Sequence, residues 1–194
     1  MKNKITLIVI LLAFVLLIGS ASVLYDQLGD SFAPDQLATH EAPQATDAAE
    51  EEAAQTVKAP DFVVYDANGQ EVRLSDYFGK PIVLNFWASW CGPCQMEMPD
   101  FQEKYQELGE DVNFLIVNMT DGDRETVEIA SKFIEAKGYT FPVFYDTAFS
   151  AATTYSVYSL PTTYFIDAEG NAIAQAAGAI DAETLQKGID MIYP

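Results

Sequence analysis

Apolar and polar positions divide the chain into three parts. Residues 5–25 form one uncharged and largely apolar run. Residues 26–58 are rich in alanine, glutamine, proline and acidic residues, and they contain few large apolar side chains. From residue 59 onward, short apolar runs alternate with stretches in which apolar residues recur every three or four positions. This third part therefore has the pattern of a folded domain that contains both strands and helices.

The short apolar runs of the third part predict strands, and its periodic stretches predict helices. The central strand is expected at residues 81–87, and the others at residues 62–65, 71–74, 112–117, 141–145, 163–167 and 171–177. Helices are expected at residues 95–108, 126–137, 148–155 and 181–192. Asn68-Gly69 indicates a hairpin turn between the first two strands. The order of elements predicts an α/β fold, with a mixed central sheet and helices on both faces.

The run at residues 5–25 is long enough to cross a membrane, since 21 residues of α-helix span about 30 Å. Lys2 and Lys4 precede it, and this predicts a cytoplasmic N-terminus with the rest of the chain outside. We therefore expect residues 1–25 to form a single-pass anchor in the cytoplasmic membrane. The alternative is a cleaved signal peptide, with a small-residue cleavage site at residues 19–21.

The second part of the chain has too few apolar residues to offset the entropy lost on ordering. Residues 26–58 are therefore expected to be a flexible acidic linker, which leaves residues 59–194 as one domain. The whole chain has a formal charge of −19, and residues 60–194 hold 7 basic against 21 acidic residues, a net −14. Binding to phosphates needs a basic surface, so nucleic acid is excluded as an expected partner.

The two cysteines of the chain, Cys91 and Cys94, lie where the central strand is expected to meet the next helix. At this spacing a dithiol can close and reopen in place, and so carry an electron pair. Cys91 falls at the helix start, where the helix dipole favours the thiolate. A purely stabilising disulfide is disfavoured because it would close a very small loop. A zinc site is disfavoured because it needs about four ligands, and the one histidine, His40, is far upstream.

Several stretches of the third part match the motifs of one family. They are Ala59-Pro60-Asp61-Phe62, Gly79-Lys80-Pro81, the run from Asn85 through Cys94, Glu97-Met98-Pro99, Leu160-Pro161-Thr162-Thr163 and Ile166-Asp167. In these stretches the chain resembles the membrane-anchored, extracytoplasmic thioredoxin-like proteins of bacteria, the TlpA/ResA/CcmG type. The resemblance implies a thioredoxin fold with an N-terminal β-hairpin and a central insertion that contains the helix at residues 126–137.

The resemblance also implies roles for the cysteines and for a distant proline. Cys91 would be the attacking, exposed cysteine, and Cys94 the resolving, buried one. Pro161 would be cis and would pack against the dithiol. The backbone of Leu160 would then be offered to an incoming substrate chain, with Thr162 completing this part of the substrate site.

Glu97 matches a glutamate that the family carries three residues after its second cysteine. A carboxylate partly buried near two thiols has a raised pKa and can accept the proton of the resolving thiol; the alternative is a surface glutamate favoured by the helix dipole. Asn85 stands where thioredoxin has a buried aspartate. Trp90 is expected to dock partners, or else to pack in the core. Gly92 and Pro93 complete the substrate site and tune the reduction potential.

The resulting hypothesis is an extracytoplasmic thiol-disulfide oxidoreductase that reduces disulfides in partner proteins and acts as a monomer without cofactor or metal. By resemblance, its substrates would be apocytochrome c or other envelope proteins, and its electrons would come from a transmembrane thiol carrier of the CcdA/DsbD type. One alternative is an oxidant that inserts disulfides. A peroxide-reducing enzyme is disfavoured because Ala88 stands where a threonine or serine is expected. A binding module without turnover is a further alternative.

Overall fold

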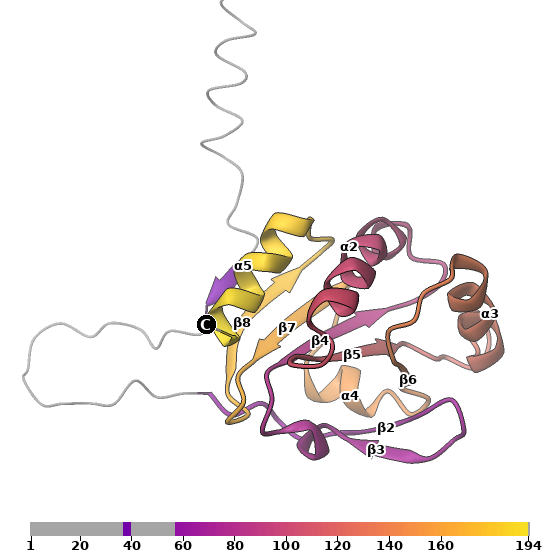
Figure 1. The fold of residues 1–194 in the computed structure, drawn as a ribbon. Coiled ribbons are helices and arrows are strands. Elements are labelled where there is room, and N and C mark those ends of the chain that lie inside the picture. The colour runs from indigo at the N-terminus through magenta and orange to yellow at the C-terminus, as the bar shows by residue number, and fades with distance from the viewer. Residues whose placement is uncertain (1–36, 40–56, 194) are drawn as a thin grey trace, which may run out of the picture. The chain divides into compact units, whose positions relative to one another are not determined.

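An eight-stranded sheet runs through the part of the chain that the computed structural model describes, residues 37–39 and 57–193 (Figure 1). The strands lie in the order β1-β8-β7-β4-β5-β6-β2-β3. Their bounds are β1 Leu37–Thr39, β2 Val63–Tyr65, β3 Glu71–Arg73, β4 Ile82–Trp87, β5 Asn113–Asn118, β6 Val143–Tyr145, β7 Thr162–Ile166 and β8 Ala172–Ala177. Strand β4 pairs parallel with β5 and antiparallel with β7, so the sheet is mixed, as predicted.

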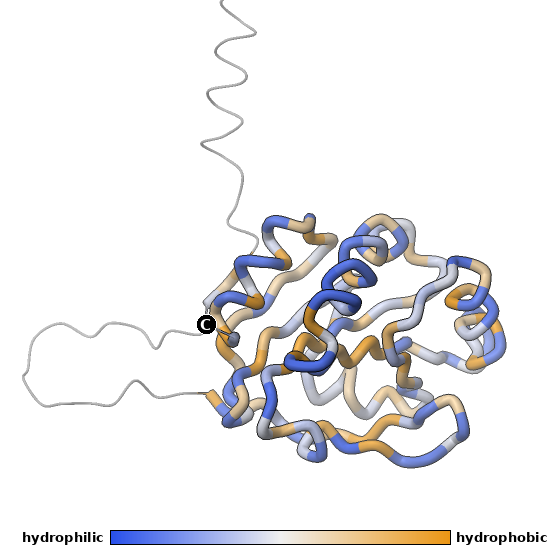
Figure 2. Tube along the Cα trace, in the orientation of Figure 1, coloured by the Kyte–Doolittle hydropathy of each residue, from blue (hydrophilic) through white to orange (hydrophobic). Residues whose placement is uncertain are grey.

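Helices cover both faces of the sheet (Figure 1). They are the 3-10 helix η1 Leu74–Tyr77 and the α-helices α2 Gly92–Leu108, α3 Val127–Lys137, α4 Ser150–Thr154 and α5 Ala182–Ile192. Side chains of β4 alternate between the two faces because strand residues point to opposite sides. Val83 and Trp87 join the core formed with α2, α3 and α5. Leu84 and Phe86 join the core formed with α4 and the β2–β3 hairpin. Figure 2 shows apolar residues concentrated along the sheet and polar residues on α2.

The starts of α2 and β6 have local causes in the sequence. Helix α2 begins at Gly92, with Cys91 as its N-cap and Pro93 in its first turn, in agreement with the expected helix start at Cys91. A proline there removes no hydrogen bond, since the first N–H groups of a helix have no partner within it. Strand β6 begins only after Pro142 and lies inside the sheet, between β5 and β2.

One strand lies within the segment expected to be a linker. Leu37–Thr39 forms β1, which pairs antiparallel with β8, and Leu37 packs against the core on the α5 side. Without β1, β8 would be the edge strand of the sheet and would offer a row of free backbone groups, so even a short segment from a polar region can pair with it. The expected anchor at residues 1–25 and the rest of the linker up to residue 56 lie outside the described residues. Among the described helices, none is long and apolar enough to cross a membrane.

Candidate active site

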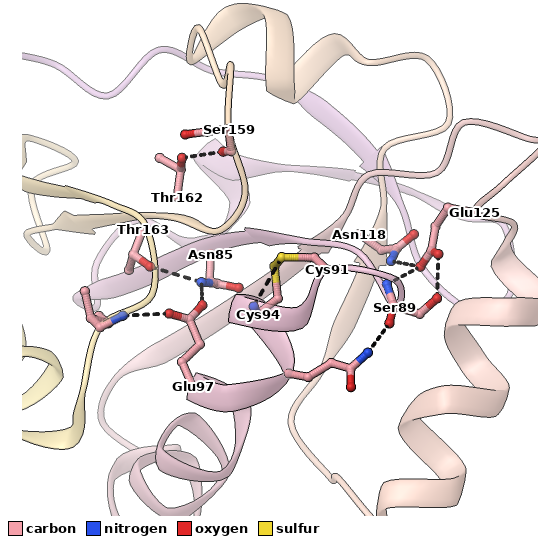
Figure 3. The surroundings of a disulfide bond; sticks show 12 residues. Asn85, Ser89, Cys91, Cys94, Glu97, Asn118, Glu125, Ser159, Thr162 and Thr163 are labelled. Atoms are coloured by element: carbon pink, nitrogen blue, oxygen red, sulfur yellow. Dashed lines mark hydrogen bonds between the residues drawn. A yellow bond between two sulfur atoms is a disulfide. The ribbon is translucent and has the colours of Figure 1, made fainter.

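The dithiol lies at the junction of β4 and α2. Cys91 and Cys94 form a disulfide, with their Cα atoms 5.3 Å apart (Figure 3). The backbone N–H of Cys94 donates a hydrogen bond to Cys91 Sγ over 3.2 Å. Cys91, which the resemblance implied to be exposed, is 5% exposed and therefore largely buried, and Cys94 is fully buried. Of the two cysteines, Cys91 alone lines the groove described next, so a partner can approach Cys91 first. This hydrogen bond and the helix start both favour a thiolate at Cys91 once the disulfide is reduced.

A groove of about 430 Å³ opens beside Cys91. It is lined by Trp90, Cys91, Gly92, Pro93, Met119, Asp121, Phe149, Val157, Tyr158, Ser159 and Leu160. Three large apolar side chains on it are open to solvent: Trp90 at 43%, Phe149 at 37% and Tyr158 at 94%. Trp90 is therefore part of an exposed surface and does not pack in the core.

The structure brings four of the six expected substrate residues, Trp90, Gly92, Pro93 and Leu160, to this groove. The Leu160–Pro161 peptide bond is cis, as the resemblance implied. Pro161 and Thr162 are both buried. The hydroxyl of Thr162 donates to the Ser159 carbonyl over 2.9 Å. These two residues therefore shape the segment that carries Leu160, and their own side chains are turned away from solvent.

Glu97 is a buried carboxylate, 2% exposed, one helical turn after Cys94. Its Oε1 accepts a hydrogen bond from Asn85 Nδ2 over 2.8 Å, and its Oε2 accepts one from the Ile180 N–H over 3.0 Å (Figure 3). Burial raises the pKa of Glu97 to about 7; the hydrogen bonds from Ile180 and Asn85 oppose this shift, and the charge of Asp100 adds to it. Glu97 is thus not a surface glutamate.

The hydrogen-bonding roles of two polar residues near the dithiol, Asn85 and Glu125, could not be predicted from the sequence. The amide of Asn85 holds Glu97 and also donates to Thr163 Oγ1 over 3.0 Å, so this position supports the carboxylate next to the dithiol. Glu125 is fully buried and accepts hydrogen bonds from Ser89, two residues before Cys91. A glutamate just before a helix has the sequence signature of a surface residue, so no signal marked Glu125.

Comparison with known proteins agrees with this geometry. Residues 56–175 match the model of the AhpC/TSA family. The thiol-disulfide oxidoreductase ResA of Geobacillus kaustophilus is 40% identical over 137 residues, which cover 70% of this chain and 76% of that protein. The chain belongs to the AhpC/TSA family and is a ResA-like thiol-disulfide oxidoreductase.

Solved structures support the same assignment of the fold. StoA from Bacillus subtilis aligns with a TM-score of 0.58 at 27% identity, covering 69% of this chain and 98% of StoA. The exposed lipoprotein thioredoxin of Streptococcus pneumoniae aligns with a TM-score of 0.57 at 35% identity, covering 68% of this chain and 98% of that one. The ResA-like domain therefore has the predicted thioredoxin fold, and its Cys91–Cys94 disulfide fits a Cys-x-x-Cys motif.

Proposed function

We propose that this ResA-like oxidoreductase reduces disulfides in partner proteins. The observation that carries the proposal is the arrangement of three groups at the start of α2: a sulfur beside a groove, a fully buried sulfur and a buried carboxylate. The groove gives a partner access to Cys91, and Cys94 is shielded from it. Glu97 stands one turn beyond Cys94 with a pKa of about 7, where it can exchange a proton near neutral pH.

The reaction proceeds by two thiol–disulfide exchanges. The Cys91 thiolate attacks one sulfur of the partner disulfide; that bond breaks, a mixed disulfide forms, and the other partner sulfur leaves as a thiolate. Cys94 then attacks Cys91 Sγ, which forms the Cys91–Cys94 disulfide and releases the second partner sulfur. Two electrons pass to the partner, whose two sulfurs take up protons. A thiol donor returns the oxidised protein to the dithiol.

Glu97 serves the second exchange as a general base. Cys94 is fully buried, and its thiol must lose a proton before it attacks. An ionised carboxylate one turn away accepts that proton, and its raised pKa keeps it close to the working range of a base at neutral pH. Asn85 and Ile180 hold the carboxylate in place through both of its oxygens.

The partners and location follow from the sequence pattern and the resemblance. Residues 5–25 would anchor the domain on the outer side of the cytoplasmic membrane. The substrates would be disulfides of apocytochrome c or other envelope proteins, and the donor would be a transmembrane thiol carrier of the CcdA/DsbD type. The pneumococcal neighbour is itself described as an exposed lipoprotein.

Cys94→Ser in the full chain is expected to accumulate mixed disulfides with partner proteins. The first exchange still proceeds at Cys91, but the resolving sulfur is gone, so the adduct persists. Non-reducing gel electrophoresis of membrane fractions, followed by mass spectrometry of the bands, identifies the partners. The Cys91→Ser/Cys94→Ser double variant is the control and should give no adduct. Adducts of equal yield in the double variant, or none with Cys94→Ser, would count against the proposal.

A further inference from the structure

Glu125 is a buried carboxylate that the reaction above does not use. It is fully buried, although the four residues before it, 121–124, are exposed. Burying a carboxylate is costly unless hydrogen bonds replace the lost water. The hydrogen-bond donors to Glu125 therefore show which groups the loop at residues 121–125 holds in place.

Three donors converge on the Glu125 carboxylate (Figure 3). The Ser89 N–H donates to Oε1 over 2.8 Å, and the Ser89 hydroxyl donates to Oε2 over 2.6 Å. Asn118 Nδ2 donates to Oε1 over 2.7 Å. Asn118 is itself oriented by the Thr120 hydroxyl, which donates to its Oδ1 over 2.8 Å. Glu125 thus ties the segment that follows β4 to the end of β5.

The loop that carries Glu125 has its own internal support. Asp121 Oδ1 accepts hydrogen bonds from the N–H groups of Asp123 and Glu125, both over 2.8 Å. The Gly122 N–H donates to the Glu125 carbonyl over 3.0 Å. Arg124, the neighbouring residue, places its guanidinium carbon 4.0 Å from the ring centre of Trp90. The loop therefore contacts both residues that directly precede Cys91, through Glu125 and Arg124.

We propose that Glu125 is a positioning residue for the nucleophile Cys91. Ser89 is held at its N–H and hydroxyl by Glu125, and at its carbonyl by Gln95 Nε2 over 2.6 Å. None of these contacts involves a sulfur atom, so opening the disulfide does not itself remove any of them. Cys91 Sγ then stays at the start of α2, where the thiolate is favoured and a partner disulfide can be met in line. A misplacement of about 1 Å can cost a reaction about 100-fold.

The test compares Glu125→Gln with Glu125→Ala in the full-length protein. Both remove the carboxylate, but glutamine keeps an oxygen for the Ser89 N–H and an amide that can donate to the Ser89 hydroxyl. The difference between the two variants therefore reports the loss of these hydrogen bonds together with the cavity that alanine leaves at a buried position. Glu128→Gln is the matched control, since Glu128 is an exposed residue of α3 that pairs with Lys132.

Two readouts separate positioning from a merely structural role. The first is the pKa of the Cys91 thiol, taken from the pH dependence of its alkylation; it should be higher in Glu125→Ala than in Glu125→Gln. The second is kcat/KM for reduction of a partner disulfide, expected to be about tenfold lower in Glu125→Ala than in Glu125→Gln, which should stay within about threefold of wild type. Glu128→Gln should match wild type in both. Equal values in the two Glu125 variants would overturn the proposal.

The kinetic readout rests on the proposed function, whereas the alkylation readout does not. If the wild-type protein fails to reduce partner disulfides, the proposed function fails, and alkylation still decides whether Glu125 positions Cys91. If Glu125→Ala does not fold, Ser89→Ala replaces it, because this change removes only the hydroxyl contact. A higher Cys91 pKa in Ser89→Ala would support the proposal, and an unchanged pKa would overturn it.

Discussion

Cys91→Ser is expected to abolish reduction of partner disulfides, a loss on the order of 10³-fold or more, because a serine hydroxyl stays protonated and cannot form the mixed disulfide. The change is small in volume and falls at the N-cap of α2, a position where serine is itself favoured. The fold should therefore survive. The rate at which the reduced protein opens the disulfide of a partner protein measures the effect, and thermal unfolding under reducing conditions checks the fold.

The same variant separates an oxidoreductase from a binding module. A module that only holds its partners through the groove beside Cys91 should keep its function in cells after Cys91→Ser, since the groove itself remains. An oxidoreductase should lose it. Retention of wild-type function by a well-folded Cys91→Ser protein would therefore contradict the enzyme account.

Glu97→Gln is expected to slow the second exchange, the attack of Cys94 on the mixed disulfide, by about 100-fold at pH 7. Glutamine is close in size but cannot take a proton from the Cys94 thiol. The first exchange, which depends on Cys91, should change much less. Rapid mixing of the reduced protein with a disulfide substrate, followed by acid quenching and separation of the adduct, gives the two rates separately.

The pH dependence of the second exchange gives a sharper test of Glu97. Only the ionised carboxylate can act as a base, so in the wild type this rate should rise with pH and level off above the Glu97 pKa of about 7. In Glu97→Gln the rate should continue to rise towards the ordinary thiol pKa of about 8.5. Asp100→Asn is a second probe of the same group. The charge of Asp100 raises the pKa of Glu97, so this variant should show the levelling of the rate at a lower pH than the wild type. Identical profiles for wild type and Glu97→Gln would exclude the base role.

The parts of this site that could be predicted are those set by neighbouring residues. The apolar run of β4 and the dithiol at the start of α2 lie within about fourteen residues, and each follows from local pattern. The identity of Glu97 came from the resemblance, which also implied its place near the thiols. Its burial could be stated only as a hypothesis, because burial depends on what packs against the helix.

The rest of the site depends on contacts between distant parts of the chain. Ile180, which donates to Glu97, lies 83 residues further along, in the connection between β8 and α5. Glu125 reaches Ser89 across 36 residues, and nothing in its local sequence marks it as buried. Strand β1 forms because β8 has backbone groups free to pair with it. The composition of residues 37–39 and their neighbours is that of a linker and does not predict this pairing. In each case the deciding partner is supplied by the tertiary fold.

The reduction potential of the Cys91–Cys94 pair tests the central claim most directly. Equilibration of the full-length protein with defined glutathione or dithiothreitol buffers, followed by thiol labelling, gives the value. A reductant of partner disulfides should have a potential near or below roughly −220 mV, the range of thioredoxins and glutaredoxins. A potential near roughly −120 mV, as in strong periplasmic oxidants, would contradict the account and make disulfide insertion the direction of the reaction.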